Sequence, residues 1–389
     1  MKKLLSLFLA LMLLFTVSAC GDTGKPQEIT EWYSEGTIQI TEKQIKKIVS
    51  KRYTAPKNII LIIGDGMGPN DIAIAEAYSE DAYDFGLVLN RIPNHGLATT
   101  HSASDAVTDS AASGTALSTG VKTTNGYIGK APDGSDLMTM AERARQAGKK
   151  VGIITNEEFY GATPSAFTVH SLSRNNHTEI VNSFVRFMPD VLMGCNFTTI
   201  YRLCDEEERQ ILMNDCLLAT RPQEFKEVLS TDPRCTKPFI GFNAPYLPKA
   251  TDDLAQCMQV ALNRLSYNNE EGFFLMLEGS GTDKYGHGNA IDEKIANVVT
   301  LDRAVAAALL FMEDNPDTLL VITSDHETGG VQMPASAEEV TNDLFTTDSH
   351  TDTPVRVFAV GKGSDYFKDT TVDNTDIANF LIRAIEGGK

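Results

Sequence analysis

Apolar residues gather in short continuous runs along this chain from residue 58 onward, and amphipathic stretches separate the runs. Runs of about six apolar residues without polar alternation are typical of strands buried on both faces of a sheet. They lie at 58–63, 150–155, 272–277, 318–323 and 355–360. Apolar positions with helical spacing occur at 42–50, 136–146, 179–188, 252–267, 291–313 and 375–385. This alternation predicts an α/β fold, with a mostly parallel central sheet and helices on both faces.

One segment, residues about 190–250, breaks this rhythm. It is rich in charged residues and holds four of the six cysteines. We expect it to form a small inserted cap region within one catalytic domain that extends over 57–389.

The N-terminus has the pattern of a targeting segment. Lys2 and Lys3 precede an almost wholly apolar stretch, 4–17, and Ser18-Ala19-Cys20 follow it. This stretch is too short to span a membrane and ends in small residues, so it predicts a signal peptide over 1–19. Its end resembles the lipobox of bacterial lipoproteins, which implies that Cys20 is lipidated. Ordinary signal cleavage, with Cys20 as a bystander, is the alternative.

Export and lipidation would place the protein at the extracytoplasmic face of the cell membrane. Residues 20–56 would then be the lipidated N-terminus, a tether and a lead-in helix. Oxidising conditions favour one or two disulfides among the remaining cysteines, and an odd number leaves at least one thiol free. These cysteines are Cys195, Cys204, Cys216, Cys235 and Cys257.

The formal net charge of -18 argues against nucleic acid as a partner, because Lys and Arg hold phosphate backbones. Carboxylates can instead bind cations. Asp65 follows the first apolar run and lies between two glycines, so a ligand could approach it closely. A plain turn with Asp65 as a helix cap is the alternative.

Ser110 follows Asp109 and precedes small residues, which indicates a tightly packed helix start. Backbone N–H groups at such a position favour an anion, although simple capping is the commoner explanation.

Further acidic and imidazole groups follow the later runs. Glu278 follows the run at 272–277. Asp283 and His287 are four residues apart, so a helix would place both on one side. Asp325-His326 follows the run at 318–323, and His350 precedes the last one. Because the carboxyl ends of parallel strands meet at one edge, we expect one pocket to collect them. Aspartate and histidine without cysteine suit zinc or a harder divalent ion.

Together these motifs resemble the alkaline phosphatase family, in the family's order, from about Lys57 to the C-terminus. They are Gly64-Asp65-Gly66-Met67-Gly68, Asp109-Ser110-Ala111, Gly161-Ala162-Thr163-Pro164-Ser165, His170-Ser171-Leu172-Ser173-Arg174, Glu278…Asp283…His287, Asp325-His326 and His350.

The resemblance implies a metal-dependent phosphomonoesterase with a phosphoserine intermediate on Ser110. It implies that Arg174 grips two phosphate oxygens, that Asp109 orients Arg174, and that Lys284 touches phosphate through water. Two zinc ions and one magnesium ion are implied as cofactors. The ligands of one zinc would be Asp283, His287 and His350. Those of the other zinc would be Asp65, Asp325 and His326, with Ser110 beside them. The ligands of magnesium would be Asp65, Thr163 and Glu278.

Two features depart from the family pattern. Gly161 stands where many members have an Asp or His that supports the third metal through water. The stretch between His326 and His350 is short where larger members carry a crown domain used in dimer contacts, so a dimer is possible but open.

Small-molecule phosphate monoesters are the expected substrates, because Ser110 and Arg174 occur together. A phosphodiesterase of the same superfamily is the main alternative. A non-catalytic lipoprotein that binds phosphate or metal is the other, and it would need no nucleophile.

Overall fold

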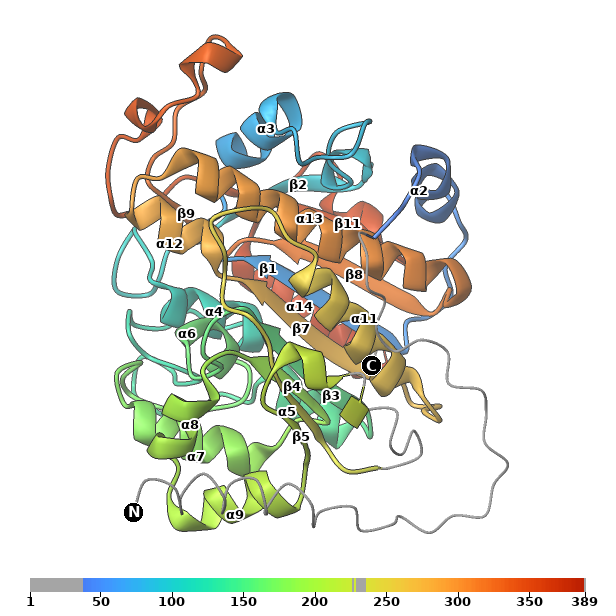
Figure 1. Ribbon diagram of the computed structural model, residues 1–389, viewed down its shortest axis with the longest axis vertical. Helices are drawn as coiled ribbons and strands as arrows, with labels where there is room; N and C mark the ends of the chain where they lie inside the picture. The colour runs from blue at the N-terminus through green and yellow to red at the C-terminus, as the bar shows by residue number, and fades with distance from the viewer. Residues whose placement is uncertain (1–37, 226, 229–235, 388–389) are drawn as a thin grey trace.

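The computed structural model describes residues 38–225, 227–228 and 236–387 (Figure 1). The expected signal peptide, Cys20 and Cys235 lie outside these residues. Within them, ten strands form one sheet in the order β12-β2-β11-β8-β1-β7-β3-β4-β6-β5. The strands are β1 (Asn58–Gly64), β2 (His95–Thr99), β3 (Lys150–Thr155), β4 (Val191–Gly194), β5 (Leu217–Ala219), β6 (Phe239–Phe242), β7 (Phe273–Gly279), β8 (Thr318–Thr323), β11 (Val355–Val360) and β12 (Thr371–Asp373).

Every neighbouring pair from β8 to β5 is parallel. The strand β11 runs antiparallel to both β8 and β2, and β12 pairs with β2 in parallel. A separate antiparallel pair joins β9 (Glu327–Thr328) to β10 (His350–Thr351). The mostly parallel sheet expected from the continuous apolar runs is therefore confirmed.

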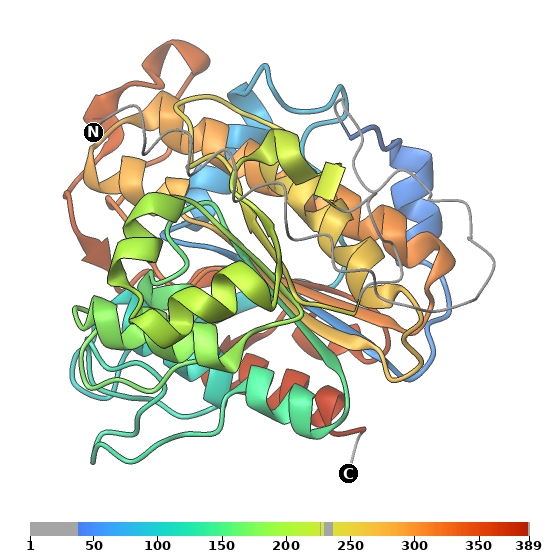
Figure 2. The ribbon, with the colours of Figure 1, turned by 60° about the horizontal axis from the view of Figure 1, so that its bottom comes forward.

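Helices cover both faces of the sheet (Figure 2). The helices are α2 (Glu42–Val49), α3 (Pro69–Tyr78), α4 (Ser110–Thr119), α5 (Met140–Gln146), α6 (Ala162–Ser165), α7 (His177–Phe187), α8 (Phe197–Leu203), α9 (Glu206–Asn214), α11 (Asp253–Ser266), α12 (Gly281–His287), α13 (Ile291–Asp314) and α14 (Asn374–Ile385).

Alternate residues of each central strand enter two different hydrophobic cores. Ile60 and Ile62 of β1 pack with α2, α3, α11 and α13, whereas Ile59, Leu61 and Ile63 pack with α4, α5, α7 and α14. All seven residues of β1 are buried, which explains why its sequence shows no polar alternation. The helix α13 is apolar enough to cross a membrane, but 83% of its most apolar window is buried, so it is a core helix here.

The segment at about 190–250 does not form a separate cap. It contributes β4, β5 and β6 to the edge of the main sheet, with α8 and α9 between the strands. The prediction missed these strands because they are only three or four residues long. Sheet formation satisfies their backbone groups, and their side chains extend the cores.

Two local expectations also change. The helix expected from residue 136 begins at Met140, because Thr139 caps it and shares a reciprocal capping box with Glu142. The four described cysteines are free and buried, so the expected disulfides are wrong for these positions. Three of them lie in the hydrophobic cores, where a thiol acts as a small apolar side chain; they are Cys204, Cys216 and Cys257.

Candidate active site

Four neighbouring strands, β3, β7, β1 and β8, bring polar groups to one edge of the sheet. Their register pairs Ile63 of β1 with Glu278 of β7 and with Thr323 of β8, and it pairs Glu278 with Thr155 of β3. Asp65 is the first residue after β1, and Asp325 is the second residue after β8. The expected convergence at the carboxyl ends is thus present, and all three carboxylates are buried.

The turn after β1 needs glycine at position 66. Gly66 has a φ of 68°, and a Cβ there would lie 2.6 Å from Asp283 Cα and 2.7 Å from Thr328 Oγ1. Its N–H donates to Asp325 Oδ1 at 3.1 Å. A residue without a side chain therefore lets the turn that carries Asp65 lie directly against Asp283 of α12 and against Thr328.

The first ligand cluster consists of Asp65, Asp325 and His326. One ligand atom from each lies within 4.8 Å of the others. His326 Nε2 is 3.2 Å from Asp325 Oδ2 and 3.5 Å from Asp65 Oδ1. Burial and His350 lower the pKa of His326 to about 4, so its ring is neutral and can act as a ligand.

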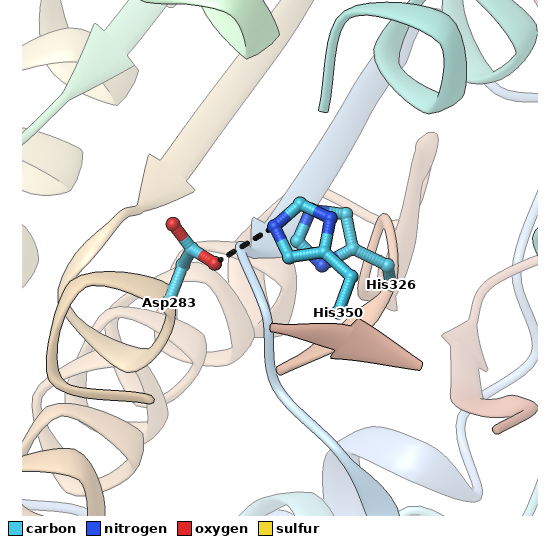
Figure 3. Close-up of side chains that lie close together, drawn as sticks. All are labelled: Asp283, His326 and His350. Carbon is cyan, nitrogen blue, oxygen red and sulfur yellow. Dashed lines mark ion pairs between the residues drawn. The ribbon is translucent and has the colours of Figure 1, made fainter. Parts of the chain in front are cut away.

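The second cluster consists of Asp283, His287 and His350. Asp283 Oδ1 is 3.3 Å from His287 Nε2 and 3.4 Å from His350 Nε2, and the two ring nitrogens are 3.2 Å apart. Figure 3 shows Asp283 facing His350, with the ring of His326 stacked against that of His350 at 3.5 Å between centroids. The two clusters are therefore adjacent, and Asp283, His326 and His350 also meet the spacing of a ligand triad.

Outer hydrogen bonds orient all three histidines. The Nδ1 atoms of His287 and His350 lie 2.6 Å from Asp348 O and 2.9 Å from Thr108 O. A carbonyl only accepts, so each Nδ1 carries the proton and each Nε2 is free to bind a metal. Thr328 Oγ1 lies 3.2 Å from His326 Nδ1 and donates to Asp283 Oδ1 at 2.7 Å, which links the clusters. Thr328 is not among the site residues predicted from the sequence.

Ser110 is the first residue of α4, and Asp109 is its N-cap. Ser110 Oγ lies 3.2 Å from His326 Nε2, beside the first cluster. The small residues after Ser110 allow α4 to be buried along its whole length, and Ser113 Oγ donates to Asp325 O at 2.7 Å. The helix start thus directs backbone N–H groups and a hydroxyl toward the ligand clusters.

Arg174 lies next to this helix start, as expected. Its Nη1 donates to Asp109 Oδ2 at 3.1 Å. The same carboxylate accepts from the N–H groups of Ala112 and Gly126. Asp109 therefore caps α4 and fixes Arg174 with one side chain.

The remaining two expected ligands of the third metal are also buried. Thr163 Oγ1 and Glu278 Oε1 have no hydrogen-bond partner. Asp65 Oδ1 and Asp325 Oδ2 are likewise buried and unpartnered. Buried polar atoms without partners are costly, so these four oxygens fit a site that cations complete.

The electrostatics agree with this fit. Burial, and then Asp325 and Asp283, raise the pKa of Asp65 well above its usual value. Burial, and then Asp283, raise the pKa of Asp325 to about 7. Burial and the neighbouring acids thus disfavour the ionised form of both carboxylates, and a bound cation would offset this. Oxygen and nitrogen donors without sulfur suit zinc or harder divalent ions.

Lys284, which is expected to touch phosphate through water, lies among acidic side chains in this structure. Its Nζ is 3.1 Å from Glu157 Oε2 and 3.6 Å from Asp283 Oδ2. Burial disfavours its ammonium, but Glu157 and the other acids outweigh this and raise the pKa of Lys284. Glu157 is not among the site residues predicted from the sequence, although it follows the carboxyl end of β3, just as Asp65 and Asp325 follow the ends of β1 and β8.

Comparison with known proteins shows to which family the chain belongs. The family model described as alkaline phosphatase matches residues 56–190 and 246–340, more than half of the chain. The chain belongs to the alkaline phosphatase family. The interruption of the match coincides with the segment that builds β4, β5 and β6.

Individual relatives agree with the family match. Alkaline phosphatase 4 of Bacillus subtilis is 31% identical over 328 residues, which cover 79% of this chain and 68% of the relative. The alkaline phosphatase of Escherichia coli is 30% identical over 385 residues, which cover 83% of this chain and 81% of the relative. The structure of alkaline phosphatase from the Antarctic bacterium TAB5 matches with a TM-score of 0.76 at 28% identity, over 86% of this chain and 100% of that one.

The phosphatase is therefore a phosphomonoesterase of a metal-dependent family. Ser110, Arg174 and both three-residue ligand clusters lie at the edge of the sheet where the sequence places them.

Proposed function

We propose that this phosphatase hydrolyses small-molecule phosphate monoesters through a phosphoserine on Ser110, with two zinc ions and one magnesium ion. Asp283, His287 and His350 would hold one zinc, and Asp65, Asp325 and His326 the other. Asp65, Thr163 and Glu278 would hold magnesium. Such cations supply positive charge to the attacking and leaving oxygens of an in-line displacement. Two structures of TAB5 phosphatase variants carry magnesium at a site named M3, which supports magnesium as the third ion.

The chain's own residues position the transfer. Ser110 Oγ forms a bond to phosphorus as the ester P–O bond breaks, and the proton of the serine ends on the released alcohol. Water then cleaves the phosphoserine, which restores the serine hydroxyl and releases inorganic phosphate. The N-terminus of α4 orients Ser110 and favours the phosphate charge.

Arg174 provides the charge-assisted contact to the non-bridging oxygens. Asp109 holds one side of the guanidinium at 3.1 Å, which leaves the other N–H groups for phosphate. A monoester carries one more negative charge than a diester, so this contact favours monoesters. Lys284, with its Nζ 3.6 Å from Asp283 Oδ2, adds positive charge beside the second cluster.

The observation that carries the proposal is the position of Ser110 Oγ, 3.2 Å from His326 Nε2 at a helix N-terminus. It can be tested by acid-quenching the zinc-loaded protein with a monoester and mapping the phosphorylated residue by mass spectrometry. We expect phosphate on Ser110 and none in Ser110→Ala. Ser113→Ala, which changes a serine one turn along α4, should still be labelled. Labelling elsewhere, or none despite turnover, would refute the phosphoserine.

We also propose that the protein is an exported lipoprotein, anchored through Cys20 at the extracytoplasmic face of the membrane. The support is the apolar stretch 4–17 followed by Ser18-Ala19-Cys20. Fatty-acid labelling of the wild type and of Cys20→Ala in a bacterial host tests this proposal. Equal labelling of the two proteins would contradict it.

A further inference from the structure

Gly161 lacks a conformational reason to be glycine. Its φ is −52° and its ψ is 159°. This is a backbone conformation that residues with side chains also adopt. It precedes α6, the helix that carries Thr163 of the proposed magnesium site. The reason for glycine must therefore be the space around it.

Glu157 fills that space. A Cβ on residue 161 would overlap Glu157 Oε1. Glu157 is 9% exposed, and its backbone is fixed next to β3, because its N–H donates to Thr155 Oγ1 and its carbonyl accepts from the N–H of Cys195. A carboxylate from residue 157 thus lies where a side chain on residue 161 would begin.

The surroundings of this carboxylate are those of the third site. Thr155 Oγ1 donates to Glu278 Oε2 at 2.5 Å and accepts from the N–H of Glu157 at 3.1 Å, so one threonine side chain joins Glu157 to Glu278. Lys284 Nζ lies 3.1 Å from Glu157 Oε2. The buried oxygens Thr163 Oγ1, Glu278 Oε1 and Asp65 Oδ1 have no hydrogen-bond partner. Glu157 therefore lies beside an incomplete set of oxygen ligands, and it also holds Lys284.

We propose that Glu157 supplies the carboxylate that Gly161 lacks, and that it supports Mg²⁺ in the site formed by Asp65, Thr163 and Glu278 while it positions Lys284. This inference rests on the proposed function for the identity of that site. It assigns a new residue to the site: the acid comes from the segment after β3, four positions before the glycine. An outer carboxylate typically changes metal affinity by about 10–100-fold.

The test is an isothermal titration of Mg²⁺ into the zinc-loaded full-length protein. We expect Glu157→Gln to weaken magnesium binding at least about tenfold while the zinc content stays at the wild-type level. Glu158→Gln is the matched control, because it removes the adjacent acid, which accepts from Asn196 Nδ2 at 3.0 Å instead of facing the site. This control should bind magnesium like the wild type.

If Glu157→Gln folds poorly, a variant in which the carboxylate is moved from residue 157 to residue 161 provides a second test. In Glu157→Ala/Gly161→Asp the overlap at position 161 is gone and an acid is present again. We expect this double variant to recover most of the affinity that Glu157→Ala loses. Equal magnesium affinity of wild type and Glu157→Gln, or no recovery in the double variant, would overturn the proposal. Because binding is measured without turnover, a failure of Ser110 labelling would remain a separate result.

Discussion

Arg174 is the residue whose geometry, more than its charge, matters for substrate choice. Asp109 Oδ2 holds its Nη1, so the guanidinium can present its remaining N–H groups in one fixed plane. A lysine at this position keeps the charge but loses the fork.

We therefore predict that Arg174→Lys lowers kcat/KM for a monoester by about 10–100-fold, equivalent to roughly 1.5–3 kcal/mol for a hydrogen bond to a charged group. Steady-state kinetics with p-nitrophenyl phosphate measures this change. Arg202→Lys on the exposed side of α8 is the control and should behave like the wild type. If Arg174→Lys matched the wild type, a bidentate role for Arg174 would be ruled out.

At the scale of elements, a buried ion pair fixes the loop that carries Asp65. Lys294 of α13 and Asp71 of α3 are fully buried, with Nζ 2.6 Å from Oδ2. Lys294 also donates to Gly66 O at 2.9 Å, and Asp71 Oδ2 accepts from the N–H of Gly68 at 2.7 Å. Both helices thus hold the turn between β1 and α3.

Lys294→Met should lower the free energy of unfolding by about 3–5 kcal/mol, because it leaves the buried carboxylate of Asp71 uncompensated. Asp71→Asn/Lys294→Met removes both charges and should be less destabilised than the single variant. Urea unfolding, monitored by circular dichroism, gives both values. A loss below about 1 kcal/mol in Lys294→Met would show that the pair does not stabilise this loop.

The elements also show what the sequence could and could not predict. Long buried strands such as β1 and β8 can be recognised in the sequence, because both of their faces are covered and their central positions are all apolar. The three-residue strands β5 and β12 carry too few residues for any period to be visible. The antiparallel direction of β11 depends on contacts with β2 and β8 that are distant in sequence.

The same limit applies to the site. Asp65, Asp325 and His326 could be found because they lie within three residues of the ends of long strands. Glu157 follows β3 but belongs to no motif used for the family resemblance. Lys294 lies within an apolar helix, where only the folded structure shows that its ammonium meets Asp71.

For the whole molecule, the buried carboxylates connect metal binding to stability. Asp65, Glu278, Asp283 and Asp325 are each at most 3% exposed, although they lie at the carboxyl edge of the sheet. Cations that bind only the folded chain stabilise it by mass action, by about 4 kcal/mol at a concentration 1,000 times Kd. Without cations the acids repel one another.

We predict that chelation lowers the melting temperature of the wild type, and that added zinc restores it. The effect of Asp325→Asn on stability should have opposite signs in the two states. The substitution removes repulsion between carboxylates in the metal-free protein, but it removes a metal ligand in the loaded protein. Its metal-free form should be more stable than the metal-free wild type, and its zinc-loaded form less stable. Differential scanning calorimetry tests both signs, and a melting temperature insensitive to chelation would contradict the account.

The most direct test of the central claim compares hydrolysis of p-nitrophenyl phosphate with that of bis-p-nitrophenyl phosphate. The protein is loaded with zinc and magnesium, and the wild type is measured beside Ser110→Ala. We predict a clear preference for the monoester and a loss of at least about 1,000-fold in kcat for Ser110→Ala, as is usual when a nucleophile is removed. A preference for the diester, or full monoesterase activity in Ser110→Ala, would contradict the assignment of a serine-dependent phosphomonoesterase.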